Sequence, residues 1–257
     1  MTNGQADVPP LLEERRGHVL ILTMNRSERH HALNRALNTA LAEAVERAEQ
    51  DEDVRVIVLT GSGDQAFCAG GDMLEMSGVE RDDTPPPSGS SAAAAISRFS
   101  STPIPVIAAV NGYCYGGGAR LAIACDIRLG SENATFRLPG AEYGLVVAAA
   151  TLPRLVGASK AKELIFTGRP FNAADALAWG LLSSVHPQEE LLPAALELAD
   201  EIAANSVAAV RASKQVIDAA TLPDAAVALE VDTNRELRGS PEQVERFRTA
   251  TKRVTGR

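Results

Sequence analysis

The chain has 257 residues, of which 45% are hydrophobic and 23% are charged, and its formal net charge at pH 7 is −8. This length is enough for one large domain or two small ones with a sizeable core, and the composition is that of a globular protein. The negative charge disfavours nucleic acid as a general partner, because such binding rests on basic patches. A small polyanionic ligand would need only a local cluster of cations.

No apolar run approaches the roughly 20 residues that span a bilayer. The first residues, MTNGQADVPP, lack the basic start and apolar core of a secretory signal. We therefore expect a cytoplasmic protein with no membrane partner. The three cysteines, Cys68, Cys114 and Cys125, lie in apolar or glycine-rich surroundings, and their odd number favours reduced, buried thiols over a disulfide scaffold.

In chain order, residues 18–24 (HVLILTM) predict a strand, and apolar residues at helical spacing predict a helix over 32–50. Two further apolar runs, at 54–61 (VRVIVLTG) and 104–112 (IPVIAAVNG), predict buried strands. Strands without clean alternation, separated by helices, indicate an α/β protein in which helices cover both faces of the sheet.

Residues 80–95 (ERDDTPPPSGSSAAAA) interrupt this pattern with prolines, small residues and acidic charges, which predict a surface loop. The loop is either a tolerated insertion or a lid over a site. After Pro187 the strand signal fades, and alanine, leucine, glutamate and arginine recur at helical spacing. We expect a core domain over 12–190 and a helical C-terminal subdomain over 191–257.

Three consecutive glycines follow the strand at 104–112 and open an apparent helix, in the stretch NGYCYGGGARLAIACD (111–126). A helix N-terminus carries unpaired N–H groups and partial positive charge, and glycines let a ligand approach that backbone closely. The element therefore either presents an N–H to a negative oxygen or simply makes a tight turn. It lacks the Gly-Lys-Ser/Thr ending of a P-loop and the spacing of a dinucleotide motif.

A second glycine turn, AFCAGGDM (66–73), also follows a buried strand and leads into a predicted helix that Asp72 could cap. If the two turns meet, the backbone N–H groups of Gly71 and Gly117 could converge on one carbonyl oxygen. Two such donors constitute an oxyanion hole.

Several motifs occur in a fixed order: FCAGGD, PVIAAVNGYCYGGG, LAIACDIR, ATFRLPGAEYGL and FTGRPFNAADALAWGLLSSV. In this combination, from about residue 12 to the C-terminal TKR, the chain resembles the crotonase (enoyl-CoA hydratase/isomerase) superfamily. The resemblance implies an α/β crotonase-like spiral of ββα units with a helical C-terminal trimerisation region, and hence a homo-trimer or a dimer of trimers. It implies an acyl-CoA thioester as substrate or ligand, without a cofactor or metal. By motif position, Gly71 and Gly117 would stabilise a thioester enolate.

The resemblance also points to substrate-binding and CoA-binding residues. The segment ERHHALN (28–34) matches the CoA-contacting stretch of the family, although His31 stands where asparagine is common and Ser27 where proline is common. An aromatic residue and cations near the C-terminus, Phe247, Lys252 and Arg253, fit the family pattern loosely. Each cation could equally be an ordinary solvated charge. The expected binding residues are Arg29, His30, Ala32, Ala69, Gly70, Asp72, Arg120, Gly140, Phe247 and Lys252.

The chain departs from the hydratase pattern at both catalytic positions. Hydratases hold one glutamate two residues after the glycine triplet and another after the proline of the F-x-x-P-E motif; here these residues are Arg120 and Gly140. Water addition needs carboxylates that activate the water and deliver a proton, which neither residue supplies. Glu142 is a substitute acid/base, or else a structural carboxylate. The non-acidic stretch 145–151 (LVVAAAT) predicts an apolar pocket floor that suits an acyl chain.

Two functions remain open at this stage. The first is an enoyl-CoA hydratase/isomerase-type enzyme, a lyase or isomerase of fatty-acid or acyl-CoA metabolism, that stabilises a thioester enolate. The second is a non-catalytic acyl-CoA binder or carrier on the same fold. RNA binding, known in some relatives, is disfavoured by the charge of −8. Arg120 could pair with Glu142, bind a substrate carboxylate, or pack beside the pocket.

Overall fold

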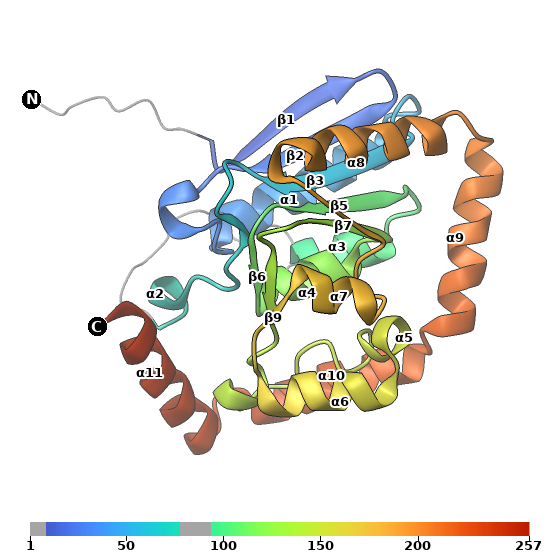
Figure 1. The fold of residues 1–257 in the computed structure, drawn as a ribbon. Helices are drawn as coiled ribbons and strands as arrows, with labels where there is room; N and C mark the ends of the chain where they lie inside the picture. Colours follow the sequence, from blue (N-terminus) through green and yellow to red (C-terminus); the bar gives the residue numbers. More distant parts are fainter. Residues whose placement is uncertain (1–8, 78–93, 257) are drawn as a thin grey trace, which may run out of the picture.

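The computed structural model describes residues 9–77 and 94–256. Within these residues two sheets are surrounded by helices (Figure 1). The larger, six-stranded sheet has the order β1 (Leu11–Arg16), β2 (Val19–Met24), β3 (Val56–Gly61), β5 (Val106–Val110), β7 (Ile127–Ser131), β10 (Ser184–His186). The smaller, four-stranded sheet has the order β4 (Ala66–Cys68), β6 (Tyr113–Tyr115), β8 (Thr135–Arg137), β9 (Phe171–Asn172).

The helices of the first half are η1 (Ser27–Arg29), α1 (Arg35–Gln50), α2 (Met73–Met76), α3 (Ala94–Ser101) and α4 (Gly117–Ala124). Those that follow are η2 (Ala141–Tyr143), α5 (Pro153–Val156), α6 (Ala158–Thr167), α7 (Ala173–Ala178), α8 (Gln188–Ala203), α9 (Val207–Thr221), α10 (Asp224–Leu237) and α11 (Pro241–Thr255). The strands and the helix expected before residue 112 are thereby confirmed, with small shifts of their ends.

A repeating unit builds the core. Strands β3, β5 and β7 of the larger sheet are each followed directly by a short strand of the smaller sheet, β4, β6 and β8. Helices α2 and α3 follow the first pair and α4 follows the second. Pairing within the larger sheet is parallel from β2 to β10. The predicted α/β spiral of ββα units is confirmed.

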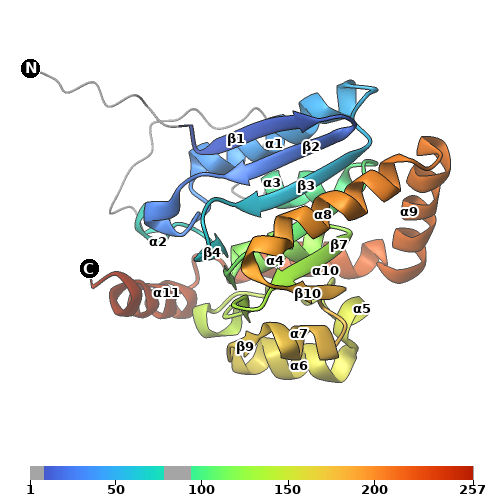
Figure 2. The ribbon, with the colours of Figure 1, turned by 45° about the horizontal axis from the view of Figure 1, so that its top comes forward.

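Helices cover both faces of the larger sheet (Figure 2). Along β3, Val56 and Val58 pack toward α8, while Ile57 and Leu59 pack into the cluster that contains α1, α3 and α4. Because both faces of the strand are buried, it reads as one continuous apolar run. This explains why sequence alternation was absent there.

The free edge of the larger sheet is protected by charge. Strand β1, with the sequence LLEERR, pairs antiparallel with β2, and five of its six residues are exposed. Three of its charges are paired, Glu13 with Arg47, Arg15 with Asp51 and Arg16 with Asp200. Charged side chains on an edge strand discourage pairing with a further strand.

The chain after residue 187 is helical, as predicted. The expected boundary at 190/191 falls inside α8, whose Leu191, Ala195 and Ala199 form the second apolar layer on the larger sheet. In contrast, α9 has no buried residue and α10 has one. Of the predicted loop 80–95, residues 80–93 lie outside the described residues, and α3 begins at Ala94. None of the helices in the described ranges is long and apolar enough to cross a membrane.

Candidate functional site

Each glycine of the triplet has its own structural reason. Gly116 precedes α4 with φ +51°, in a region that side chains disfavour. A Cβ on Gly117 would stand 3.3 Å from the Gly71 nitrogen. A Cβ on Gly118 would stand only 2.1 Å from the carbonyl oxygen of Cys68. The triplet therefore lets the start of α4 lie directly against the backbone of the other glycine turn.

The second glycine turn is held in place by the segment after η1. Leu33 bridges to Gly71, with the Leu33 N–H donating to the Gly70 carbonyl at 2.7 Å and the Asp72 N–H donating to Leu33 at 3.1 Å. Gly70 has φ +109°, and a Cβ there would stand 2.9 Å from the Tyr115 carbonyl oxygen. The backbone segments 30–34, 68–72 and 115–118 thus meet at one place.

The backbone N–H groups of Gly71 and Gly117 both lie at this junction. Within the described part of the chain, neither Gly71 nor Gly117 donates its N–H to a hydrogen-bond acceptor. Gly117 is the first residue of α4, where N–H groups have no partner inside the helix. Both glycines are half-buried. The predicted convergence of the two turns is therefore seen in the backbone positions.

Asp72 lies under the junction rather than on its surface. Its carboxylate accepts the N–H groups of Leu74 and Glu75 as the N-cap of α2, which confirms the predicted cap. The other oxygen pairs with Arg26 at 3.1 Å, and Asp72 is only 5% exposed. Its side chain holds the turn through both oxygens, and its contact with CoA stays a prediction.

His31 is a support residue that sequence reasoning noted only as a departure from the family pattern. It is 1% exposed. Its Nδ1 accepts the backbone N–H of Arg26 at 3.0 Å, and its Nε2 lies 3.0 Å from the Ser62 carbonyl oxygen. Burial lowers the pKa of His31 from its ordinary value of 6.5. The ring is therefore neutral, with its hydrogen on Nε2, and joins η1 to the end of β3.

The other predicted CoA residues before α1 lie close together around η1. The His30 carbonyl accepts the Ala69 N–H at 2.9 Å. Ala32 donates its N–H to Arg29 at 3.0 Å, and its carbonyl accepts the Arg26 guanidinium. His30 and Ala69 are exposed, Arg29 is half-buried, and the His30 ring contacts Tyr113. The structure brings these residues together, and their binding to CoA stays a prediction.

Helix α11 brings the predicted C-terminal residues toward the same end of the molecule. In Figures 1 and 2 it lies beside α2. Phe247 is half-buried, and its ring meets Tyr143 of η2 edge-on, with centroids 6.4 Å apart. Lys252 is exposed. An aromatic residue and a cation therefore reach the neighbourhood of α2 from the same chain.

The partners of Arg120 and Glu142 differ from one of the arrangements considered above. Arg120 faces Glu230 of α10, with Nη2 to Oε1 at 3.5 Å. Glu142 instead pairs with Arg137 through one oxygen and with Arg253 through the other. The suggested pair of Arg120 with Glu142 is therefore wrong. Sequence could not reveal the true partner, because Glu230 looks like any other acidic residue of an amphipathic helix.

Gly140 is closely packed rather than open. A Cβ at this position would stand 2.4 Å from Cγ2 of Val147 and 2.9 Å from the Leu145 carbonyl oxygen. The apolar segment predicted as a pocket floor thus occupies the volume that a side chain at residue 140 would need. Gly140 lies next to Pro139, whose ring is 4.0 Å from the Cβ position of Gly116. The segment is therefore close to the glycine triplet.

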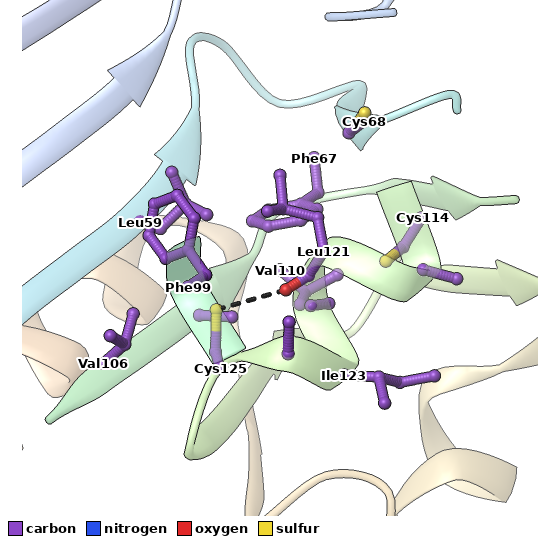
Figure 3. Close-up of a cluster of buried hydrophobic side chains, with 14 of the residues drawn as sticks. Leu59, Phe67, Cys68, Phe99, Val106, Val110, Cys114, Leu121, Ile123 and Cys125 are labelled. Carbon is purple, nitrogen blue, oxygen red and sulfur yellow. Dashed lines mark hydrogen bonds between the residues drawn. The ribbon is translucent and has the colours of Figure 1, made fainter. Parts of the chain in front are cut away.

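The three cysteines are structural. Cys68, Cys114 and Cys125 are free thiols inside the apolar cluster of Figure 3, where Cys125 donates to the Leu121 carbonyl. Burial raises the pKa of Cys68 and of Cys125 to about 12, and that of Cys114 well above its ordinary value. Since the thiolate is the nucleophile, none of them is suited to covalent catalysis. The prediction of reduced, buried thiols is confirmed.

A cavity of about 690 Å³ lies elsewhere, between α9, the end of α8, α5 and the starts of β5 and β7. Two ion pairs lie among its walls, Lys214 with Asp126 and Arg154 with Asp218. No residue of the glycine junction lines it. The junction and this cavity are separate features.

Comparison with known proteins gives a consistent result. The family model described as enoyl-CoA hydratase/isomerase matches residues 14–253. The chain is 36% identical to the short-chain-enoyl-CoA hydratase of Clostridium acetobutylicum over 208 residues, which is 80% of this chain and 79% of that protein. It is 37% identical to the 2,3-dehydroadipyl-CoA hydratase of Escherichia coli over 210 residues, which is 80% of this chain and 81% of that protein.

A solved structure agrees with these sequence matches. The crystal structure of carnitinyl-CoA hydratase from Mycobacterium avium superimposes with a TM-score of 0.84 at 34% identity. The alignment covers 96% of this chain and 97% of that chain. The similarity therefore extends over the core and the C-terminal helices.

Proposed function

The chain belongs to the enoyl-CoA hydratase/isomerase family, and from this premise we propose that it binds an acyl-CoA thioester at the glycine junction. The thioester oxygen lies between the N–H groups of Gly71 and Gly117. The observation that carries the proposal is that the backbones of these two glycines lie close together. Their N–H groups donate to no acceptor in the described chain.

This arrangement would stabilise negative charge on the thioester oxygen. When a proton leaves the α-carbon of an acyl thioester, the charge moves onto that oxygen as an enolate. Two fixed N–H donors stabilise the charge without reorganising, and the positive end of the α4 dipole adds to them. The site therefore favours reactions that pass through a thioester enolate.

Ordinary hydration is not the reaction we propose. A base must lie within hydrogen-bond reach of the proton that it removes. Arg120 cannot serve, and a glutamate in place of Gly140 would collide with Val147. Glu142, the substitute considered from the sequence, already accepts a hydrogen bond from an arginine on each oxygen. We therefore expect very weak hydration of crotonyl-CoA.

The same observations favour a second function, acyl-CoA binding without turnover. Asp72, Glu142 and Glu230 lie around the junction and the neighbouring segment, and each is engaged by an arginine side chain, while Glu75 of α2 accepts the backbone N–H of Arg35. A binder needs the two N–H donors and the apolar wall, but no free carboxylate.

Three measurements on the purified protein test these proposals. Calorimetry should show acyl-CoA binding, and the carbonyl stretch of a ¹³C-labelled thioester should shift to lower frequency on binding. Turnover of a 3-enoyl-CoA would support the enzyme, and tight binding without turnover would support the binder. An unshifted carbonyl stretch, or efficient crotonyl-CoA hydration, would contradict the assignment of the site.

A matched pair of variants tests the donor at Gly117. Gly117→Pro removes an N–H at the first position of α4, where proline is tolerated, and its Cβ would also crowd the Gly71 nitrogen at 3.3 Å. It should abolish acyl-CoA binding, or lower any turnover by about 10²–10³-fold. Ala158→Pro removes the equivalent N–H at the first position of α6. Ala158 is exposed and away from the junction, so this variant should leave acyl-CoA binding and turnover unchanged. Equal behaviour of the two variants would refute the role of Gly117.

A further inference from the structure

Helix α10 meets the rest of the chain mainly through one buried carboxylate. Glu230 is its only buried residue, at 8% exposed. Glu230 Oε1 accepts the N–H of Ala148 at 3.2 Å, and Oε2 accepts the N–H of Ala150 at 2.8 Å. One side chain of the C-terminal helices thus fixes two backbone positions of the segment 146–150.

A second side chain, one turn further along the same face of α10, fixes the start of that segment. Asn234 accepts the N–H of Val146 at 3.0 Å and donates to the Val146 carbonyl at 2.7 Å. Together with Glu230 it satisfies three N–H groups and one carbonyl of the segment. Backbone groups satisfied from outside in this way do not depend on regular secondary structure.

Arg120 ties this arrangement to the glycine triplet. It lies one turn inside α4, where its N–H donates to the Gly116 carbonyl at 3.0 Å. Its guanidinium faces Glu230 at 3.5 Å and compensates the buried charge. We call Arg120, Glu230 and Asn234 the polar latch.

The latched segment holds an unusual backbone conformation. Ala148 has φ +57°, which residues other than glycine rarely adopt, and it is 1% exposed. This conformation directs Val147 into the space beside Gly140, where a Cβ would be only 2.4 Å from Val147. Strained backbone persists where its surroundings fix it, and here the N–H of the strained residue is bound by Glu230.

An acid/base role for Glu230 does not fit this geometry. Its oxygens accept two backbone N–H groups and face a guanidinium, so they are directed at the protein rather than at a reacting carbon. The contacts fit a residue that positions others.

We propose that the polar latch sets the shape of the wall that an acyl chain meets beyond the glycine junction, and so determines which acyl-CoA thioesters the site accepts. Glu230 and Asn234 are positioning residues that act through Val147, and Arg120 neutralises Glu230. The inference rests on the proposed function for its ligand class, whereas the latch itself can be tested without any ligand.

The experiment compares Glu230→Gln with Asp232→Asn. Both remove one negative charge from α10, but Asp232 is exposed and, among the residues that the structure describes, pairs only with Arg235 on the same helix. The first readout is hydrogen exchange of the ligand-free protein. A glutamine keeps one acceptor oxygen, so in Glu230→Gln at least one of the amides of Ala148 and Ala150 should exchange about tenfold faster or more, whereas Asp232→Asn should match the wild type.

The second readout is selectivity, measured as the ratio of dissociation constants for butanoyl-CoA and octanoyl-CoA. We expect Glu230→Gln to change this ratio by about tenfold, the scale on which apolar pockets discriminate chain size, with binding of free CoA unchanged. Ala148→Gly removes the strain at residue 148, so adding it to Glu230→Gln should restore part of the wild-type ratio. A general loss of stability would not change the ratio while leaving binding of free CoA unchanged, and Ala148→Gly would not restore the ratio.

The outcomes are distinguishable. Unchanged exchange at Ala148 and Ala150 would overturn the latch. Faster exchange with an unchanged ratio would overturn its role in selectivity. Failure of the wild type to bind either thioester would overturn the proposed function and with it the proposed role of the latch in selectivity. The hydrogen-exchange data would still test whether the latch exists. If Glu230→Gln does not fold, Asn234→Ala replaces it. This variant keeps the ion pair of Arg120 with Glu230 and should speed hydrogen exchange at the Val146 amide.

Discussion

At the scale of single residues, His31 couples the stability of the junction to pH. Its Nδ1 accepts an N–H, so a proton added there would face another donor and break that contact. Burial is the largest cause of its lowered pKa and outweighs the Ser62 carbonyl, which raises it. The folded protein therefore binds a proton at His31 less readily than the unfolded chain does.

The sign of the effect follows from linkage. Below pH 6.5, the ordinary pKa of the group, the unfolded chain holds more protons, so stability falls as pH decreases from that value toward the lower folded pKa. We predict that between pH 7.5 and 5.5 His31→Asn loses less stability than the wild type. Urea denaturation at the two pH values measures this, with the exposed His18→Asn as control. An identical pH dependence in His31→Asn and the wild type would disprove it.

From the sequence, single residues could be singled out as candidates for the site, but their contact partners in the fold could not be identified. The Asp72 cap follows from local sequence, because helix caps have local causes, whereas the meeting of Gly71 with Gly117 was expected from the family resemblance and depends on how the two turns pack. The partner of Arg120 is Glu230, far along the chain on a helix whose sequence marks no position as special. Pair contacts of this kind depend on how elements pack, which a single sequence does not encode locally.

At the scale of elements, the contact between α4 and β4 tolerates almost no added volume. A Cβ on Gly118 would approach the Cys68 carbonyl oxygen to 2.1 Å, and neither backbone can turn aside as a side chain could. The start of α4, and with it the position of the Gly117 N–H, depends on this close approach.

We predict that Gly118→Ala costs at least about 2 kcal/mol of unfolding free energy, because overpacking displaces the helix. Gly63→Ala is the control: Gly63 has φ +75°, but a Cβ there meets no atom within 4 Å, so only the backbone cost of about 1 kcal/mol applies. Urea midpoints compare the two. A smaller loss for Gly118→Ala than for Gly63→Ala would contradict the packing argument.

Three strands of the larger sheet were predicted from the sequence, whereas its strands β1, β7 and β10 and all strands of the smaller sheet were not. Strands β2, β3 and β5 are long apolar runs. Strands β4, β6 and β8 have three residues each, too few for a periodic signal, and they pair only because their longer neighbours bring them together. The smaller sheet nevertheless leads directly into both glycine turns.

At the scale of the whole molecule, the C-terminal helices expose apolar side chains. Val216 and Ile217 on α9 are 67% and 60% exposed, and Leu229 and Val231 on α10 are 68% and 50% exposed. Large apolar side chains this exposed on two consecutive helices favour an interaction surface in this part of the chain. They support the expectation of a trimer or a dimer of trimers.

We predict that light scattering at micromolar concentration gives the mass of a trimer or hexamer. Val216→Glu should shift the mass toward the monomer, because it places a charge on the apolar surface of α9. Leu12→Glu, on the charged edge strand β1, should leave the mass unchanged. A monodisperse monomer in the wild type would contradict the expectation.

The position of α10 in the chain has a consequence for biosynthesis. Domains assemble from the N-terminus as the ribosome delivers them. Both glycine turns emerge well before Glu230 and Asn234, so a nascent chain that has reached only Thr221 contains both turns but lacks the latch side chains of α10. If the latch acts as proposed, discrimination among thioesters would begin only after α10 has been made and has docked.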